Sequence, residues 1–69
     1  MDLEQMLFVL HYNLKFDRFS DIKKAVKVSG PTIYKWKKEP PVKPSLHVFC
    51  EFADYYNINY KISQIRKML

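Results

Sequence analysis

The sequence predicts an all-α fold, a compact five-helix bundle formed by a single domain over residues 1–69. Apolar residues recur every three or four positions along most of the chain, which is the spacing of one helix face. Glycine, proline and capping residues divide this pattern into five segments. No segment shows the clean alternation of a half-buried strand. With 69 residues, of which 48% are hydrophobic, the chain can form one small core.

The first two helices are predicted over residues 2–13 and 18–27. Asp2 and Gln5 have the spacing of a capping box, and Asn13 is expected to end the first helix. The core stripe of this helix is expected to comprise Leu3, Met6, Leu7, Leu10 and Leu14, widened by Phe8 and Val9. The apolar face of the second helix consists of Phe19, Ile22, Ala25 and Val26.

The third helix is predicted to start at a Gly-Pro pair and to run to Lys38. Ser29 suits the N-cap position, and Pro31 falls in the first turn, where its missing N–H costs nothing. Ile33 and Trp36 are three positions apart and are expected to face the core. The residues left on the outer side are Tyr34, Lys35, Lys37 and Lys38.

Two further helices follow a stiff segment, EPPVKPS. Ser45 is expected to cap a helix over residues 46–57, and Asn57 to end it. Its core stripe is predicted to be Leu46, Phe49, Ala53 and Tyr56, flanked by Cys50 and Phe52. Asn59 is expected to cap a short helix over residues 60–68, with Ile62, Ile65 and Met68 on one side.

The charge of +5 is concentrated in the middle of the chain. Residues 18–44 carry eight Lys or Arg against Asp21 and Glu39, a net +6, whereas residues 1–17 carry −2 and residues 45–69 carry +1. A basic cluster of this kind is typical of a protein with a polyanionic partner. A solvated basic surface without a partner is the alternative.

Two short helices joined by a tight turn, the second basic on its outer side, have the layout of a helix-turn-helix. Residues 16–59 resemble the Cro-like and related phage-repressor helix-turn-helix domains. The first matching block comprises Ile22, Val26, Val28, Ser29, Thr32, Ile33 and Trp36. The second comprises Pro44, Ser45, Leu46, Phe49, Ala53, Tyr56 and Ile58.

The resemblance implies a lambda-repressor-like fold and a sequence-specific DNA-binding transcriptional regulator. It also implies a homodimer on a double-stranded DNA operator in a bacterial host cytoplasm, acting as a Cro-like repressor of a phage or prophage switch. Helix 29–38 would then lie in the major groove. The expected base contacts are Thr32, Tyr34 and Lys35, with Gly30 and Pro31 at the family's base-reading positions. The expected phosphate contacts are Arg18, Lys23, Lys24, Lys27, Lys37, Lys38 and Lys43.

The sequence departs from the family pattern at the expected interface. Lys23 stands where Ala is usual, and Lys27 stands at a turn position where Gly and a positive φ are common. Phe19 replaces a Gln that often contacts phosphate. Gly30 and Pro31 offer no side-chain hydrogen bonds. Gly30 and Pro31 favour an alternative function, an antirepressor or modulator of the same fold that binds a partner repressor protein, whereas the basic segment favours DNA.

Apolar residues beyond the core stripes predict an oligomer or partner interface formed by Val48, Tyr55, Ile62, Ile65, Met68 and Leu69. The alternative is that some of them pack over the first helix. No nucleophile with a base and no phosphate-binding glycine loop is present, so no enzyme activity and no cofactor are expected. His11, His47 and Cys50 are too few and too scattered to predict a metal site. No apolar run is long enough to predict a membrane span. Trp36 could stack on a base, but its spacing from Ile33 favours the core.

Overall fold

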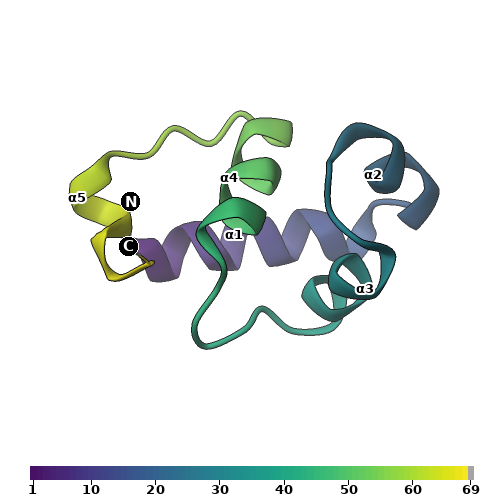
Figure 1. Ribbon diagram of the computed structural model, residues 1–69, viewed down its shortest axis with the longest axis horizontal. Coiled ribbons are helices and arrows are strands. Elements are labelled where there is room, and N and C mark those ends of the chain that lie inside the picture. Colours follow the sequence, from purple (N-terminus) through teal and green to yellow (C-terminus); the bar gives the residue numbers. More distant parts are fainter. Residues whose placement is uncertain (69) are drawn as a thin grey trace.

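The structure, a computed structural model, describes residues 1–68. Over these residues it contains five α-helices, one 3₁₀ turn and no strand (Figure 1). The elements in chain order are α1 (Leu3–Phe16), α2 (Phe19–Ala25), α3 (Gly30–Lys38), α4 (Leu46–Tyr55), α5 (Ile62–Ile65) and η1 (Arg66–Met68). The prediction of a compact all-helical domain is confirmed.

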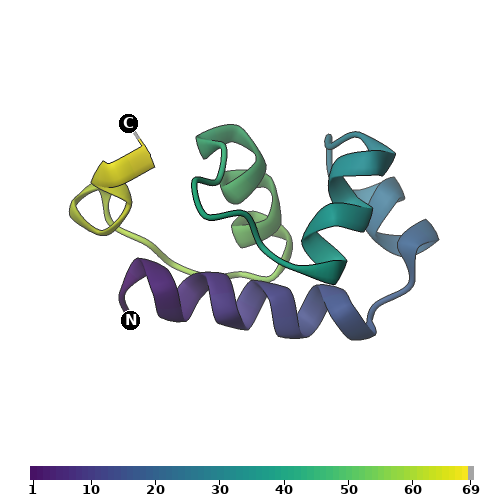
Figure 2. The same cartoon turned by 90° about the horizontal axis from the view of Figure 1, so that it is seen from below.

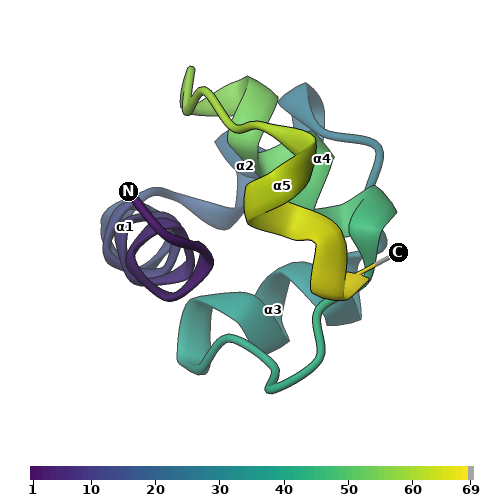
Figure 3. The ribbon, with the colours of Figure 1, turned by 90° about the vertical axis from the view of Figure 1, so that its left-hand side faces the viewer.

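The longest helix, α1, runs along one side of the molecule, and the other helices lie on its inner side. In Figures 1 and 2, α2 and α3 lie towards the C-terminal end of α1, α4 lies over its middle, and α5 lies at its N-terminal end. Figure 3 looks along α1 and shows the same one-sided arrangement. The Nε2 group of Gln64 donates a 2.6 Å hydrogen bond to the carbonyl of Met1, which joins α5 to the start of the chain.

One core fills the space between these helices, and each of the five α-helices contributes at least one large side chain that is at most 2% exposed. The buried residues that form this core are Met6, Leu10, Leu14, Ile22, Val26, Val28, Ile33, Trp36, Phe49, Phe52, Ala53 and Ile65. The predicted helix phases are therefore confirmed for the inner sides of α1 and α3. Phe52, expected beside the core stripe of α4, is fully buried.

The capping box of α1 is confirmed, but the predicted end of this helix is wrong. Asp2 accepts a 2.8 Å hydrogen bond from the amide of Gln5, and the Gln5 side chain accepts one of 2.8 Å from the amide of Asp2. Asn13 does not end the helix; its side-chain amide donates to the carbonyl of Val9 within the helix. The helix continues for one more turn to Phe16.

The second helix is shorter than predicted because the chain becomes extended at Val26. From Val26 to Ser29, buried and exposed residues alternate, so both valines reach the core from extended backbone. A helix would have turned one of them away. Lys27 therefore has no positive φ, contrary to the strain expected at this position; among residues 1–68, Asn57 is the one non-glycine residue with a positive φ.

The ends of α3 and α4 follow the sequence signals in part. Ser29 occupies the N-cap of α3, but its hydroxyl pairs with Thr32 Oγ1 at 2.8 Å rather than with a backbone amide. Asn57 ends α4 in a left-handed conformation with φ of 56°. The amide of Ile58 donates to the carbonyl of Ala53 at 2.8 Å, which is the hydrogen bond of a Schellman ending.

The last helix starts later than predicted. Residues 58–61 are not helical, and Lys61 rather than Asn59 is the N-cap of α5. The side chain of Gln64 accepts a 2.7 Å hydrogen bond from the amide of Lys61, which fixes this start. Ile65 is 1% exposed and completes the core at this end of the molecule.

Candidate nucleic-acid interface

The inner side of α3 is fixed by two core residues. Ile33 is fully buried and Trp36 is 2% exposed. The Trp36 ring packs against Phe52 with ring centroids 5.0 Å apart, and its backbone carbonyl lies 3.1 Å from Nδ1 of His11. Trp36 is therefore a core residue, as its spacing predicted, and not a stacking surface for bases. The side of α3 that faces away from the core carries Pro31, Tyr34, Lys35 and Lys38.

The first turn of α3 has an apolar outer surface. Pro31 is exposed and Tyr34 is 59% exposed. Thr32 is half-buried, and its hydroxyl is engaged with Ser29, so its methyl group is the part free of hydrogen bonds. Gly30 and Pro31 add no polar side-chain atom. Of the five expected base contacts, only Tyr34 and Lys35 carry a polar group at an exposed position.

Phe19 explains two features of this turn that the sequence left open. Its ring stacks on the ring of Tyr34, with centroids 4.3 Å apart and planes 7° from parallel. A Cβ atom built on Gly30 would lie 3.3 Å from Cζ of Phe19, so the ring packs directly over the glycine. Phe19 thus joins the start of α2 to α3. The stacking geometry could not be read from sequence spacing.

Cationic side chains lie on α2 and α3, at the N-cap of α2 and in the segments that follow these two helices. The exposed members, which we call the cationic rim, are Arg18, Lys23, Lys24, Lys27, Lys35, Lys38 and Lys43. The ammonium of Lys23 lies 3.3 Å from the carbonyl of Val28 and is held near the connection between α2 and α3. The structure thus leaves the expected phosphate contacts accessible, with one exception.

The exception is Lys37, which is half-buried and turned towards α1. Its ammonium donates to the backbone carbonyls of Leu14 and Asp17, at the C-terminal end of α1. A cation at this end of a helix satisfies carbonyls that have no partner within the helix and interacts favourably with the helix dipole. The structure therefore assigns Lys37 to the fold, and the expectation of a phosphate contact at this position is corrected.

The connection between α2 and α3 is held by α4. Glu51 accepts a 2.6 Å hydrogen bond from the amide of Lys27, and Nε2 of His47 lies 3.2 Å from the carbonyl of the same residue. His47 and Glu51 are four positions apart, so they lie on one side of α4. They fix the backbone of Lys27 while its side chain stays exposed. These supporting residues were missed, because contacts to backbone leave no sequence signal.

Asp17 links the end of α4 to the end of α1. Its carboxylate accepts a 2.6 Å hydrogen bond from the hydroxyl of Tyr56. Burial raises the pKa of Tyr56 well above its ordinary value, and the hydrogen bond to Asp17 raises it further. The phenol therefore stays neutral, and α3 and α4 are both anchored to the segment that leads into α2.

The predicted C-terminal interface is largely used by the fold itself. Ile65 lies in the core, and Val48, Tyr55 and Met68 are half-buried and pack against it. Ile62, at 60% exposed, is the one predicted member with a large exposed surface among the described residues, and Leu69 lies outside them. The excess apolar surface lies on α1 instead, where Phe8 was expected to widen the core and is 69% exposed.

The residues of possible metal or catalytic type are separate from one another. Cys50 accepts a 3.1 Å hydrogen bond from the hydroxyl of Tyr60, and that bond, with burial, raises the pKa of Tyr60 to about 12. His47 faces the backbone of Lys27 instead. Within residues 1–68, no three His, Cys, Asp or Glu side chains are placed to hold a metal ion.

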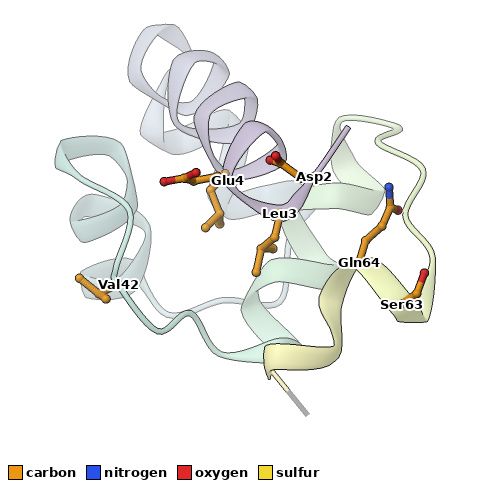
Figure 4. Close-up of a pocket in the computed structure, with 7 residues that line it drawn as sticks. Asp2, Leu3, Glu4, Val42, Ser63 and Gln64 are labelled. Carbon is orange, nitrogen blue, oxygen red and sulfur yellow. The ribbon is translucent and has the colours of Figure 1, made fainter.

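A hollow lies between the start of α1, Val42 and α5. Figure 4 shows Val42 on one side of it, Ser63 and Gln64 on the other, and Leu3 between them. Its volume is about 540 Å³. Asp2 at its edge is engaged in the capping box of α1, and among the described residues that line the hollow there is no histidine, lysine or arginine to act as a base beside Glu4.

The chain has no match in comparisons with models of known protein families, with curated proteins or with solved structures. Over residues 1–68, no helix combines the length and apolar character needed to cross a membrane.

Proposed function

We propose that the chain is a helix-turn-helix protein of the lambda-repressor-like type that binds double-stranded DNA through α3. The observation that carries the proposal is the cationic rim around an outward-facing helix. The rim carries seven cations, whereas its segment of the chain, residues 18–44, contains only two acidic residues. Such a surface attracts the phosphates of both strands while the helix lies in the major groove.

In this proposal, the first turn of α3 and Lys35 in its middle recognise different bases. Lys35 extends from the middle of the helix and donates to guanine O6 and N7. The first turn supplies apolar atoms from Pro31, the methyl group of Thr32 and the edge of Tyr34. Apolar side chains recognise the 5-methyl group of thymine in the major groove. The preferred site therefore contains thymine opposite the first turn of α3 and guanine opposite Lys35.

The biological role that fits this binding is that of a small Cro-like regulator of a phage or prophage switch. Occupation of an operator would block polymerase or a competing regulator. Selection of bound duplexes from a random pool, followed by titration at several salt concentrations, tests the proposal. With four to six neutralised phosphates, the log–log slope of affinity against salt should be about −4 to −5. A flat slope, or no duplex binding at low salt, contradicts it.

A second candidate function is binding of a partner repressor protein, and the apolar first turn of α3 favours it. Gly30, Pro31 and the Phe19–Tyr34 stack form a surface with one free hydroxyl and no charge. Such a surface also suits a protein contact. The same selection experiment distinguishes the two functions, because a protein that binds only a partner would select no duplex from the random pool at physiological salt.

A further inference from the structure

Two neighbouring hollows form a groove between the first half of α1 and residues 39–42, which follow α3. The first is the hollow of Figure 4, and the second has a volume of about 520 Å³. Both are lined by Glu4, Leu7 and Val42, so they adjoin each other, and we call them together the α1 groove. Each volume falls within the range of about 300–1,000 Å³ that is typical of ligand pockets.

Exposed apolar side chains lie on both walls of the α1 groove. Phe8 on α1 is 69% exposed, and Val42 on the opposite wall is 97% exposed. Pro40 and Pro41 precede Val42, and their fixed φ angles make this wall stiff. Pro44, which is buried, holds the far end of the same segment. A stiff wall loses little conformational entropy when a ligand binds, which favours binding.

The charged residues of the α1 groove are acidic. Glu4 lines both hollows, Asp2 lines the first and Glu39 lines the second. Among the described residues no Lys or Arg lines either hollow, although the chain contains 12 of them. Lys38 and Lys43 flank the segment in sequence and lie outside both linings. The groove is therefore an acidic site on a basic protein, and it repels an anionic partner such as DNA.

His11 adds a further hydrogen-bond acceptor to the second hollow. Its Nδ1 lies 3.1 Å from the carbonyl of Trp36, and a carbonyl only accepts, so a neutral His11 carries its proton on Nδ1. Its Nε2 is then an acceptor. Together with the carboxylates of Glu4 and Glu39, it makes every polar side chain described in this hollow an acceptor. The matching ligand is rich in N–H donors.

We propose that the α1 groove binds a short segment of a partner protein that carries an apolar side chain close to an arginine or lysine. An occupant without a cation would remove Glu4 and Glu39 from water and leave them unpaired, which is unfavourable. An arginine pairs with a carboxylate through two parallel hydrogen bonds. A peptide suits two adjoining hollows, because two of its side chains enter one hollow each. This binding does not rest on DNA recognition by α3, so its test uses no DNA.

Selection from a display library of random dodecapeptides, with the whole chain as the target, tests the proposal. Enriched peptides should combine Leu, Ile or Phe with Arg or Lys, and one of them is synthesised as the probe for titration. The double variant Glu4→Gln, Glu39→Gln should weaken binding of this peptide at least about tenfold. The matched control is Asp21→Asn, Asp54→Asn, which removes the same charge at exposed positions outside the groove. It should change binding by less than about twofold at about 0.15 M salt, because distant charges are screened.

Two phenylalanines of α1 give a matched test of the apolar wall. Phe8 lines the second hollow and Phe16 lines neither, while the two are almost equally exposed. Phe8→Ala should weaken peptide binding at least about tenfold and Phe16→Ala should leave it unchanged, with the helical circular-dichroism spectrum kept in both.

Selection of no peptide, or of peptides without a cation, overturns the proposal. Equal weakening by Phe8→Ala and Phe16→Ala also overturns it, because the binding surface would then be the outer side of α1. A chain that associates with itself, and loses this association in Phe8→Ala, overturns it as well, since a second copy would then occupy the groove. Sedimentation velocity of the chain without peptide measures this last outcome.

Discussion

The outer sides of α1 and α3 differ although both helices pack on the same core. On α3, the outer side carries Pro31 and Tyr34 in its first half and lysines in its second half. On α1, the residues opposite the buried Met6, Leu10 and Leu14 are aromatic along the helix, so α1 is apolar on two sides. Helical periodicity identifies the core side of a helix when its other side is polar. For α1 the pattern predicted the buried side correctly, but Phe8, which was assigned to the core, lies on the exposed aromatic side.

The largest effects are expected where a side chain of the inner side is removed. Trp36→Ala should lower the free energy of unfolding by about 3–5 kcal/mol, because it leaves a cavity beside Phe52. Tyr12→Ala, on the outer side of α1, should change it by less than about 0.5 kcal/mol. Urea denaturation followed by circular dichroism measures both.

If Trp36→Ala does not fold, a milder variant still tests whether Trp36 lies on the inner side of α3. Trp36→Phe, which keeps an aromatic ring in the same place, should fold with intermediate stability. If Trp36→Ala keeps the wild-type unfolding midpoint and Tyr12→Ala lowers it, the assignment of the two sides is reversed.

The sequence predicted the number of helices, their order and most of the core, because these depend on local signals. The Asp2–Gln5 capping box, Pro31 in a first turn and Asn57 at a helix end each act within a few residues. The predicted boundaries failed where distant residues decide them. Lys37 stabilises an extra turn of α1 from another helix, and two buried valines extend the chain after α2.

The candidate interface was predictable in composition but not in detail. Its lysines could be assigned to the outer side from helical spacing alone, with Lys37 as the exception. The stack of Phe19 on Tyr34 and the hydrogen bonds of Glu51 and His47 to Lys27 join residues 15 to 24 positions apart. Such contacts depend on how the helices pack against one another, and the local sequence pattern carries no information about that packing.

The two exposed lysines of α3 differ in their expected effects on DNA binding. Lys35→Ala should relax the preference for one base pair in each half-site, at a cost of about 1–3 kcal/mol for that pair. Lys38→Ala should weaken all duplexes about equally, because a phosphate contact carries no sequence information. Competition between the selected duplex and its single-base variants measures both. The opposite pattern would exchange the roles of the two residues.

Lys37 connects the two helices compared above, so its replacement tests the corrected assignment. Lys37→Met should lower the free energy of unfolding by about 1–2 kcal/mol, because the carbonyls of Leu14 and Asp17 lose a charged donor. Lys38→Met, one position further on the exposed side, should leave stability unchanged. Thermal unfolding of the two variants compares them directly. Equal stability combined with weaker DNA binding in Lys37→Met would restore its role as a phosphate contact.

The hydrogen bond between Tyr56 and Asp17 predicts a loss of stability at alkaline pH. The pKa of Tyr56 is raised in the folded protein, so the neutral phenol contributes stability fully below the unfolded pKa of about 10. That contribution is lost as the pH rises above about 10. Tyr56→Phe should cost about 1 kcal/mol at pH 7 and flatten the alkaline decline.

The matched control for this prediction is Tyr60→Phe. The pKa of Tyr60 is also raised, to about 12, by its bond to Cys50. Tyr60→Phe should remove only the share of the alkaline loss of stability that comes from Tyr60. The share that comes from Tyr56 should remain in this variant. Urea denaturation between pH 7 and pH 11 separates the two. An alkaline decline that is unchanged by Tyr56→Phe would contradict the role of its hydrogen bond.

The smallest expected effect is on DNA affinity and concerns the first turn of α3. This turn is apolar, whereas the second half of the helix is cationic. If Pro31, Thr32 and Tyr34 contact thymine methyl groups, replacing those thymines by deoxyuridine removes one methyl contact each and leaves every hydrogen bond in place. Burial of one carbon group contributes about 0.8 kcal/mol, so affinity should fall by up to about fourfold per thymine. Deoxyuridine at thymines outside the half-site is the control and should have no effect. A selected duplex that binds equally well without any of its methyl groups would show that the first turn does not read thymine, although α3 still binds DNA.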